Sequence, residues 1–282
     1  MSGKVVYERR LTLFVDFLGF KDLVEKSVGD NKILNGLVRA IADATETANI
    51  GNKADFHATQ FSDCLVLSYR LKTADALFEM VNKLSLILVR LTARGYLIRG
   101  GLTYGDLVHT DKELIGPAMI RAYQLESQVA KWPRVILDPE VFDDLMNKPS
   151  ASVMKTVKKY LKRDKEDDFW YFDYISSEAV VNTISGEYEI YPEYLGTIAG
   201  LVEDGLKSKN PGVLEKYIWL HKRYKSARKP LVGLPGDHPD RRRFPGFYEA
   251  FENLPSLNKE ASAAKDFVAK AKKKAARKCK KG

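Results

Sequence analysis

The sequence predicts an α+β protein with a βαββαβ core, and three patterns in its first half lead to this fold class. Residues 9–17 alternate in polarity and are rich in apolar side chains, which is typical of a buried strand that ends at an aspartate. Residues 31–49 carry apolar side chains at helical spacing. Residues 55–61 and 64–70 then read as two strands joined by a turn at Ser62 and Asp63, which predicts a hairpin.

The remaining elements of this core follow in chain order. A turn at Gly19 and a first helix over residues 20–29 are expected between the first strand and the longer helix. Residues 74–92 place their leucines on one stripe, which predicts a core-packed helix. Residues 96–109 predict a second pair of strands with glycines at the bend. Gly116 and Pro117 then predict the start of a helix that continues to Val129, with proline in the first turn.

The second half of the chain predicts peripheral elements and a helical extension. Short strands are expected over residues 134–139 and 169–175, and amphipathic helices over residues 192–208 and 212–228. A stretch rich in proline and glycine, residues 227–246, follows these helices. The elements after the core therefore carry no pattern that points to chemistry of their own.

Composition excludes several classes of protein. A chain of 282 residues with 45% apolar and 29% charged residues is neither wholly disordered nor fibrous. Its apolar runs are too short for a bilayer span, and residues 1–14 lack the features of a secretory signal, so we expect a cytoplasmic protein. Two cysteines, Cys64 and Cys279, make neither a disulfide framework nor a four-ligand zinc site.

The net charge of +9 is concentrated at one end of the chain. Residues 259–282 hold ten basic and two acidic residues, so the other 258 residues sum to only +1. This distribution indicates a basic tail on a nearly neutral fold. We expect a solvated, flexible tail and no nucleic-acid partner, with salt-sensitive binding of nucleic acid through the tail as the alternative.

Two aspartates are the first candidates for chemistry. In a βαββαβ unit the first strand lies beside a strand of the hairpin, so Asp16 and Asp63 are expected to meet although they are 47 residues apart. Two carboxylates beside a glycine turn suit a pair of Mg²⁺ or Mn²⁺ ions that bridge a triphosphate. The Phe17 carbonyl is a further candidate ligand, and the phosphates are expected at the backbone amides of Phe17, Leu18, Gly19 and Phe20. Helix capping is the alternative role for either aspartate.

Four segments, in this order, carry a family resemblance: LFVDFLGF, QFSDCLVL, IRGGLTYGDL and IGPAMIRAYQLES. Together they resemble the catalytic domain of class III nucleotidyl cyclases, whose core is ferredoxin-like. Within that group they are similar to bacterial pyrimidine cyclases of anti-phage defence, which make cyclic UMP or cyclic CMP. The resemblance covers residues 8 to about 140, and reaches 175 at its widest. It implies a cyclase domain over residues 1–175, a helical extension over 176–258 packed on it, and the basic tail over 259–282.

The resemblance also implies roles for particular residues. Asp16 and Asp63 match the two catalytic, metal-binding aspartates of the family, and Phe17 matches the residue whose carbonyl joins them. Two divalent ions, Mn²⁺ or Mg²⁺, are the implied cofactors. The implied enzyme is a lyase that converts UTP, less readily CTP, to a cyclic second messenger of antiviral defence. The family builds its site between two subunits, so a homodimer is implied.

Departures from the family pattern bear on the substrate. The base-selecting lysine of purine cyclases falls at Thr59, and their second base-reading residue falls at Glu113. The asparagine and arginine that hold the ribose and the transition-state phosphate fall at Ile120 and Gln124. A purine-selecting set is therefore absent, which disfavours ATP and GTP. The cation that stabilises the transition state is left unassigned.

Three further side chains are candidates for the substrate site. Arg99 and Arg121 are the basic residues available to replace the missing cation. For Arg99 a structural salt bridge is the alternative, and for Arg121 an orientation toward solvent or a dimer partner. Phe14 shares the strand face of Asp16 and can stack on a base, with a core position as its alternative. A non-catalytic nucleotide sensor that kept the fold is the alternative function for the whole chain.

Overall fold

The computed structural model describes residues 5–51, 55–71, 75–146 and 157–279. The chain divides into two compact units, residues 1–174 and residues 175–282. Within the described ranges, no helix combines the length and the apolar character needed to cross a bilayer.

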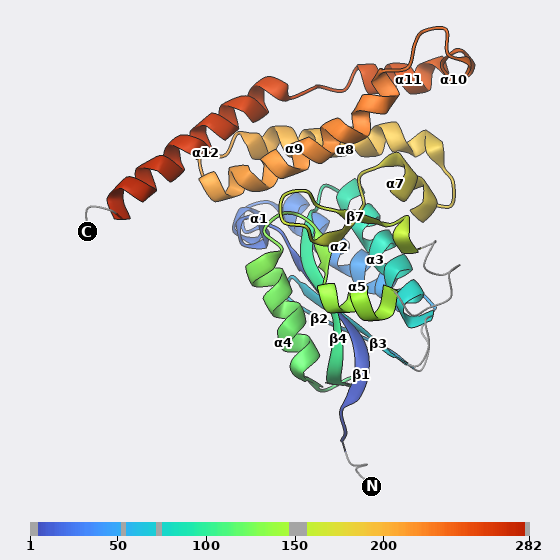
Figure 1. The fold of residues 1–282 in the computed structure, drawn as a ribbon, viewed down its shortest axis with the longest axis vertical. Coiled ribbons are helices and arrows are strands. Elements are labelled where there is room, and N and C mark those ends of the chain that lie inside the picture. Colours follow the sequence, from blue (N-terminus) through green and yellow to red (C-terminus); the bar gives the residue numbers. More distant parts are fainter. Residues whose placement is uncertain (1–4, 52–54, 72–74, 147–156, 280–282) are drawn as a thin grey trace. The chain divides into compact units, whose positions relative to one another are not determined.

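The first unit is a sheet with helices on both faces (Figure 1). Its central strands lie in the order β2-β3-β1-β4 and are antiparallel, which is the arrangement of a ferredoxin-like βαββαβ core. The predicted α+β class is thus confirmed. A parallel strand, β6, continues the sheet beside β4, followed by β8 and β7. The strands are β1 (Glu8–Phe17), β2 (Phe56–Phe61), β3 (Cys64–Arg70), β4 (Ile98–His109), β5 (Leu114–Ile115), β6 (Val135–Leu137), β7 (Leu161–Arg163) and β8 (Trp170–Phe172).

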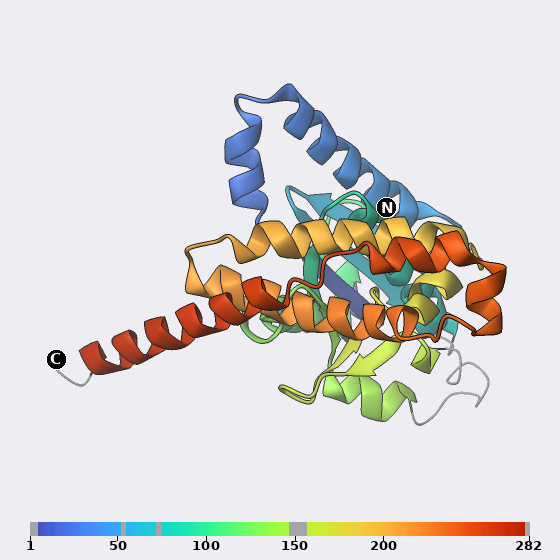
Figure 2. The same ribbon diagram turned by 90° about the horizontal axis from the view of Figure 1, so that it is seen from above.

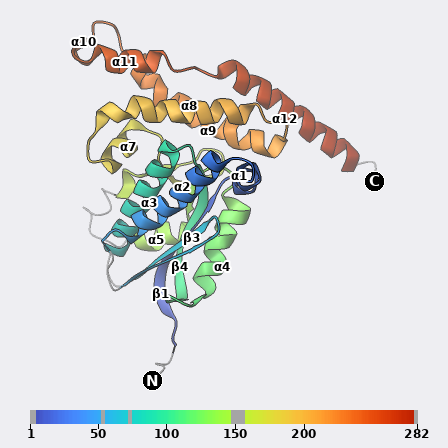
Figure 3. The same cartoon turned by 180° about the vertical axis from the view of Figure 1, so that it is seen from behind.

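Helices α2 and α3 cover one face of this sheet and α4 covers the other (Figures 1 and 3). The alternation of β1 explains this layering, because side chains at successive positions point to opposite faces. Leu11 and Leu13 are fully buried on one face, whereas Phe14 packs against Ala122 of α4 on the other. The helices are α1 (Phe20–Ser27), α2 (Asn31–Asn49), α3 (Asp75–Ala93), α4 (Pro117–Gln124), a π-helical turn (Leu125–Val129) and α5 (Pro139–Met146).

The strand pair predicted over residues 96–109 is wrong. Residues 98–109 of this range form one strand, β4, which pairs along the whole of β1. The glycines lie within the strand because a neighbour needs the space, and no bend occurs at them. A Cβ atom on Gly101 would lie 2.4 Å from the Cβ of Leu125, so glycine allows the π-helical turn to approach the sheet.

The second unit is helical. Helices α8 and α9 lie side by side (Figure 2), and they bury aromatic residues that include Trp219 and Tyr224. Parts of residues 227–246, the stretch rich in proline and glycine, are helical. The helices are α7 (Ser177–Thr183), a 3-10 turn (Tyr188–Ile190), α8 (Tyr191–Leu206), α9 (Pro211–Val232), α10 (Pro239–Arg243), α11 (Pro245–Glu252) and α12 (Asn258–Cys279).

The expectation of a flexible tail over residues 259–282 is corrected, because the described part of this segment is the helix α12. Alanine and lysine have high helix propensity. Ala264 and Val268 of α12 also pack against Leu214 and Ile218 of α9, which anchors the first half of the helix within the second unit. Its C-terminal half extends beyond α8 and α9 (Figure 2).

Candidate active site

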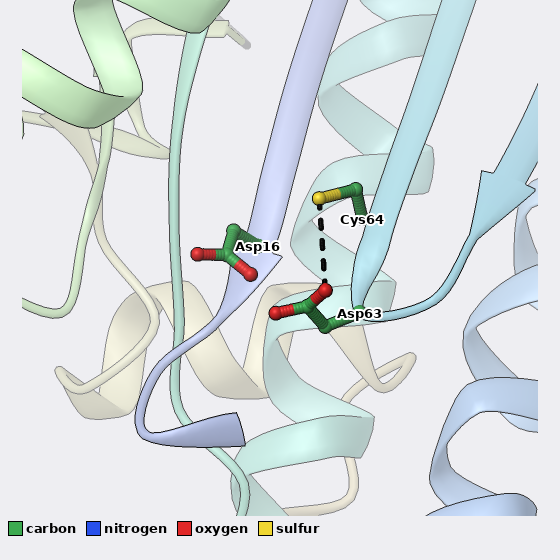
Figure 4. A group of neighbouring side chains, drawn as sticks. All are labelled: Asp16, Asp63 and Cys64. Atoms are coloured by element: carbon green, nitrogen blue, oxygen red, sulfur yellow. Dashed lines mark hydrogen bonds between the residues drawn. The ribbon is translucent and has the colours of Figure 1, made fainter. Parts of the chain in front are cut away.

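Asp16 and Asp63 converge at one end of the central strands (Figure 4). Asp16 is the penultimate residue of β1 and lies opposite Cys64, the first residue of β3, in the antiparallel register. Asp63 precedes Cys64 in the hairpin turn, which brings it beside the end of β1. One ligand atom from each of Asp16, Asp63 and Cys64 lies within 4.8 Å of the others. The topology thus joins the two carboxylates that the sequence separates.

The hairpin turn and the end of β1 hold this pair in place. Ser62 adopts a left-handed conformation with φ of 54°, as a two-residue turn between right-twisted strands requires. The backbone N–H of Phe17 donates to the carbonyl of Asp63 at 3.3 Å. Because the N–H and C=O of an extended residue face the same neighbouring strand, the Phe17 carbonyl is directed toward the hairpin turn.

A cation, Arg99, faces Asp16 from the other neighbouring strand. Arg99 of β4 lies opposite Asp16 in register, and its guanidinium is 3.9 Å from the Asp16 carboxylate. The same guanidinium donates through Nε to Glu126 at 2.6 Å. Glu126 is buried and comes from the π-helical turn after α4. Arg99 therefore forms a structural ion pair with Glu126, one of its two predicted alternatives, and it also borders the carboxylate pair.

The electrostatics of the pair favour a bound divalent cation. Burial, followed by the hydrogen bond and charge of Asp63 and the charge of Glu126, raises the pKa of Asp16 to about 8. Arg99 acts in the opposite direction but does not compensate for these effects. When all groups are ionised, three carboxylates and one guanidinium leave two negative charges, which a divalent ion would neutralise.

The donor set fits Mg²⁺ or Mn²⁺. Oδ1 of Asp16 is buried and has no hydrogen-bond partner within the described residues, as expected of an oxygen reserved for a cation. Burial and the neighbouring carboxylates raise the pKa of the Cys64 thiol to about 12, so the sulfur stays protonated and is a weak ligand. The oxygen donors that remain, the two carboxylates and the Phe17 carbonyl, are those preferred by hard cations.

Metal affinity is expected to depend on pH. Below pH 8 Asp16 carries a proton in the metal-free protein, and a cation must displace it. The affinity for Mn²⁺ should therefore rise about tenfold per pH unit between pH 6 and 8 and level off above that range. Calorimetric titration of the full chain with Mn²⁺ at four pH values measures this slope. An affinity that stays constant from pH 6 to 8 would contradict the raised pKa of Asp16.

Two of the four backbone amides expected to hold phosphates are already engaged. The N–H of Phe17 donates to Asp63, and the N–H of Leu18 donates to the carbonyl of Leu97 at 2.8 Å. Gly19, with φ of 77°, and Phe20 begin helix α1, whose first amides have no partner within a helix. Among the described residues, the amides of Gly19 and Phe20 are thus the ones left for an anion, because Leu18, the residue after β1, still donates to Leu97.

Phe14 and Arg121 are held by other contacts. Phe14 is buried against Val66 and Ala122, which is the core alternative. Arg121 makes two hydrogen bonds to Asp138, from Nε at 2.7 Å and from a terminal nitrogen at 3.0 Å. Because Asp138 is buried, it needs this cation as a partner. Arg121 thus pairs with its own fold through its guanidinium, while its side chain remains 46% exposed.

Thr59 and Glu113 take part in separate hydrogen-bond groups. The Thr59 hydroxyl lies 2.9 Å from Nε2 of His109, a buried residue that the sequence patterns did not indicate. The Glu113 carboxylate accepts from the hydroxyl of Thr110 in the turn between β4 and β5. Neither hydrogen-bonds to Asp16 or Asp63 within the described residues. The contact between Thr59 and His109 depends on the path of β4, which brings His109 over β3 and β2.

Comparison with known proteins gave matches among solved structures alone: no family model and no curated protein matches the sequence. The chain is similar to the crystal structure of the adenylyl cyclase CyaB from P. aeruginosa, with 15% identity, a TM-score of 0.44, and coverage of 59% of this chain and 94% of that one. It is also similar to the catalytic core of a rhodopsin-guanylyl cyclase with converted specificity in complex with ATPalphaS, with 15% identity, a TM-score of 0.40, and coverage of 59% and 96%.

Proposed function

We propose that the protein is a pyrimidine nucleotide cyclase that converts UTP, and less readily CTP, to the 3′,5′-cyclic monophosphate and pyrophosphate. The observation that carries this proposal is the convergence of Asp16 and Asp63 around a buried, unpartnered carboxylate oxygen. The four ordered sequence segments that resemble class III cyclases support it. The absence of the purine-selecting residues from that pattern supports a pyrimidine substrate.

In the proposed reaction the ribose 3′-oxygen forms a bond to the α-phosphorus, the bond from that phosphorus to the pyrophosphate breaks, and the 3′-hydroxyl proton is released. Asp16, Asp63 and the Phe17 carbonyl would hold the divalent ions. Bound there, such ions supply Lewis-acid activation of the hydroxyl and neutralise charge on the leaving group. The amides of Gly19 and Phe20 orient the phosphates. Glu126 and Arg99 set the charge around Asp16.

A second copy of the chain is the proposed protein partner. Ile115, Ile120 and Tyr123 are exposed apolar side chains on β5 and α4, which favours burial against another subunit. In the proposed homodimer each copy would supply residues to two equivalent sites. The proposed cellular role, a cytoplasmic second-messenger enzyme of antiviral defence, rests on the sequence resemblance.

The experiment that tests the proposed function is incubation of the purified chain with Mn²⁺ and each of UTP, CTP, ATP and GTP. We expect cyclic UMP and pyrophosphate from UTP, a slower reaction with CTP, and no product from the purine nucleotides. Chromatography of the nucleotides and a phosphate-release assay for pyrophosphate measure both products. Cyclisation of ATP or GTP at a rate equal to that of UTP would contradict the pyrimidine assignment.

One observation favours the alternative, a nucleotide sensor without catalysis. Arg99 and Arg121, the candidates for the transition-state cation, are both engaged in ion pairs within the chain. In the same experiment a sensor would bind a nucleotide, detected by calorimetry, and form no product from any of the four. The cost of holding two neighbouring carboxylates without a cation is the argument against this alternative.

A further inference from the structure

The second unit carries its positive charge on two neighbouring helices. α12 holds eight basic and two acidic residues, and α9 holds six basic residues and one acidic residue. α8, in contrast, holds three acidic residues and no basic ones. The proposed reaction uses none of these groups. The charge is therefore concentrated on one part of the unit, as expected of a surface that binds a polyanion.

The helices α9 and α12 run antiparallel, so their cations follow one another along the pair. Glu215, in the second turn of α9, forms an ion pair with Lys272 near the end of α12. His221, further along α9, lies with its Nε2 3.0 Å from the carbonyl oxygen of Ser256, just before α12 begins. The last turns of α12 therefore extend beyond the start of α9, and the end of α9 extends beyond the start of α12 (Figure 2).

Seven cations on these two helices are exposed and form no ion pair within the described part of the chain. We call them the basic track: Lys225 and Lys229 of α9, with Lys265, Lys270, Lys273, Lys274 and Arg277 of α12. The last four follow one another at intervals of three or four residues or less, which places them on one face of the helix. Asp266 is the single acidic residue of α12 between Lys265 and Arg277. The basic track is therefore nearly uniform in charge.

The buried His221 ring shows where the two halves of the basic track meet. Burial lowers the pKa of His221, and the charges of Lys265 and Lys225 lower it further. One lysine from each helix is thus close to the same ring. The antiparallel order then places Lys229 toward one end of the basic track and Arg277 toward the other.

The geometry of the basic track suits a nucleic-acid duplex better than a membrane or a single strand. From Lys265 to Arg277 α12 rises about 18 Å, the axial length of about five phosphates on one strand of DNA. A membrane-surface helix needs a free apolar face, but Ala264 and Val268 are buried against α9. A single strand needs exposed rings for stacking, and Phe267 is the one large apolar side chain exposed on the described parts of α9 and α12.

We propose that the basic track binds a nucleic-acid duplex through its phosphate backbone, without reading its sequence. The expectation of no nucleic-acid partner rests on a flexible tail, whereas the structure fixes these cations on a helix and adds cations of α9 to them. Cations held on a packed helix lose less freedom on binding than those of a flexible segment. The proposal goes beyond the proposed function and does not rest on it, because the basic track lies within the second unit.

The first test measures binding and its dependence on salt. The full chain is titrated into a labelled DNA duplex of about 20 base pairs, two helical turns, and fluorescence anisotropy is recorded in EDTA. Five to seven contacts to phosphates predict a slope of log K against log salt between about −4 and −6. A duplex of unrelated sequence should bind equally, and a single strand of the same length more weakly. A slope shallower than about −2, or tighter binding of the single strand, would overturn the proposal.

The second test locates the surface on α12. One variant replaces three lysines of this helix: Lys270→Gln, Lys273→Gln and Lys274→Gln. Glutamine matches lysine in helix propensity, so circular dichroism should be unchanged. Affinity at about 50 mM salt should fall at least about tenfold, and the slope should lose about 3. The matched control makes the same change of charge at three exposed lysines of the first unit: Lys158→Gln, Lys159→Gln and Lys165→Gln. Equal losses in both variants would overturn the proposal.

The third test asks whether α9 belongs to the surface. In the double variant Lys225→Gln, Lys229→Gln the slope should lose about 2, since each lysine accounts for one phosphate. Affinity and slope equal to those of the unmodified chain would overturn the proposed surface of two helices. Vesicles that contain phosphatidylserine serve as the second polyanion. Vesicle binding that persists at a salt concentration where duplex binding is lost would assign the basic track to a membrane and overturn the proposal.

A further variant separates this proposal from the proposed function. Asp16→Asn alters the carboxylate pair of the first unit and should bind the duplex as tightly as the unmodified chain. A chain that forms no cyclic product but binds the duplex with the predicted slope would overturn only the proposed cyclase activity. A chain that cyclises UTP and does not bind the duplex at about 50 mM salt would overturn only the basic track as a binding surface.

Discussion

Replacing Asp16 or Asp63 by asparagine is expected to lower cyclase activity at least about 1000-fold. Each substitution removes a charged donor from the pair that would hold the divalent ions. Metal ions contribute several kcal/mol of charge stabilisation in such reactions, and each 1.36 kcal/mol corresponds to a factor of ten in rate. Initial rates of cyclic UMP formation with saturating Mn²⁺ measure the loss. Activity within tenfold of the unmodified chain in either variant would remove the assignment of the metal site.

The stability of Asp16→Asn is the control that separates lost chemistry from lost folding. In the folded, metal-free protein the pKa of Asp16 is about 8 against an ordinary value of 3.8, so the folded state holds this proton more tightly than the unfolded state. Ionisation of Asp16 therefore lowers the free energy of unfolding progressively as the pH rises from about 4 to about 8. Asparagine does not ionise, so it causes no such loss in the free energy of unfolding. We expect the metal-free variant to melt at a higher temperature than the unmodified chain at pH 8, and at a similar one at pH 4.

Replacing Arg134 by methionine is expected to have the largest effect on stability, a decrease of about 3–5 kcal/mol in the free energy of unfolding. Arg134 and Asp164 are both fully buried and form an ion pair at 2.8 Å. The guanidinium also lies over the ring of Trp132, 4.5 Å from its centroid. Methionine keeps much of the volume but leaves the Asp164 carboxylate buried without its cation. Urea unfolding of the full chain, followed by circular dichroism, measures the change.

An exposed ion pair of the same unit provides the matched comparison. Arg163 of β7 pairs with Asp168 at 3.4 Å, and the two side chains are 60% and 76% exposed, so water already solvates much of their charge. Arg163→Met should cost no more than about 1 kcal/mol. We therefore predict a larger loss in the free energy of unfolding for Arg134→Met than for the exposed arginine variant. Equal losses would mean that burial does not determine the contribution of Arg134.

Several elements could be predicted because their signals are local. The alternation of residues 9–17, the apolar spacing of residues 31–49 and the turn at Ser62 and Asp63 each identify an element without knowledge of its neighbours. Residues 96–109 were predicted wrongly, because glycines that make room for Leu125 give the same pattern as glycines at a bend. The last segment is a helix where a flexible tail was expected, because its charge does not reveal that Ala264 and Val268 pack against α9.

In the candidate site, too, some features could be predicted from the sequence and others could not. Asp16 and Asp63 could be paired in advance, since antiparallel order fixes which strand ends meet. Glu126 could not be identified, because a π-helical turn changes the direction of its side chain relative to a regular helix. The amides of Phe17 and Leu18 were predicted to be available, and only the pairing at the end of β1 reveals that they are engaged.

The amino-acid sequence by itself determined the order of the elements, because backbone periodicity depends on residues near one another in the chain. It also determined the meeting of two aspartates, because the order of elements in a βαββαβ unit fixes which strands lie side by side. Only the tertiary structure decided which charged and polar groups satisfy one another. Arg99 is paired with Glu126, Arg121 with Asp138, and His109 with Ser68 and Thr59. The physical reason is that a buried polar group must find a partner, and which partner lies within about 3 Å depends on how strands and helices pack.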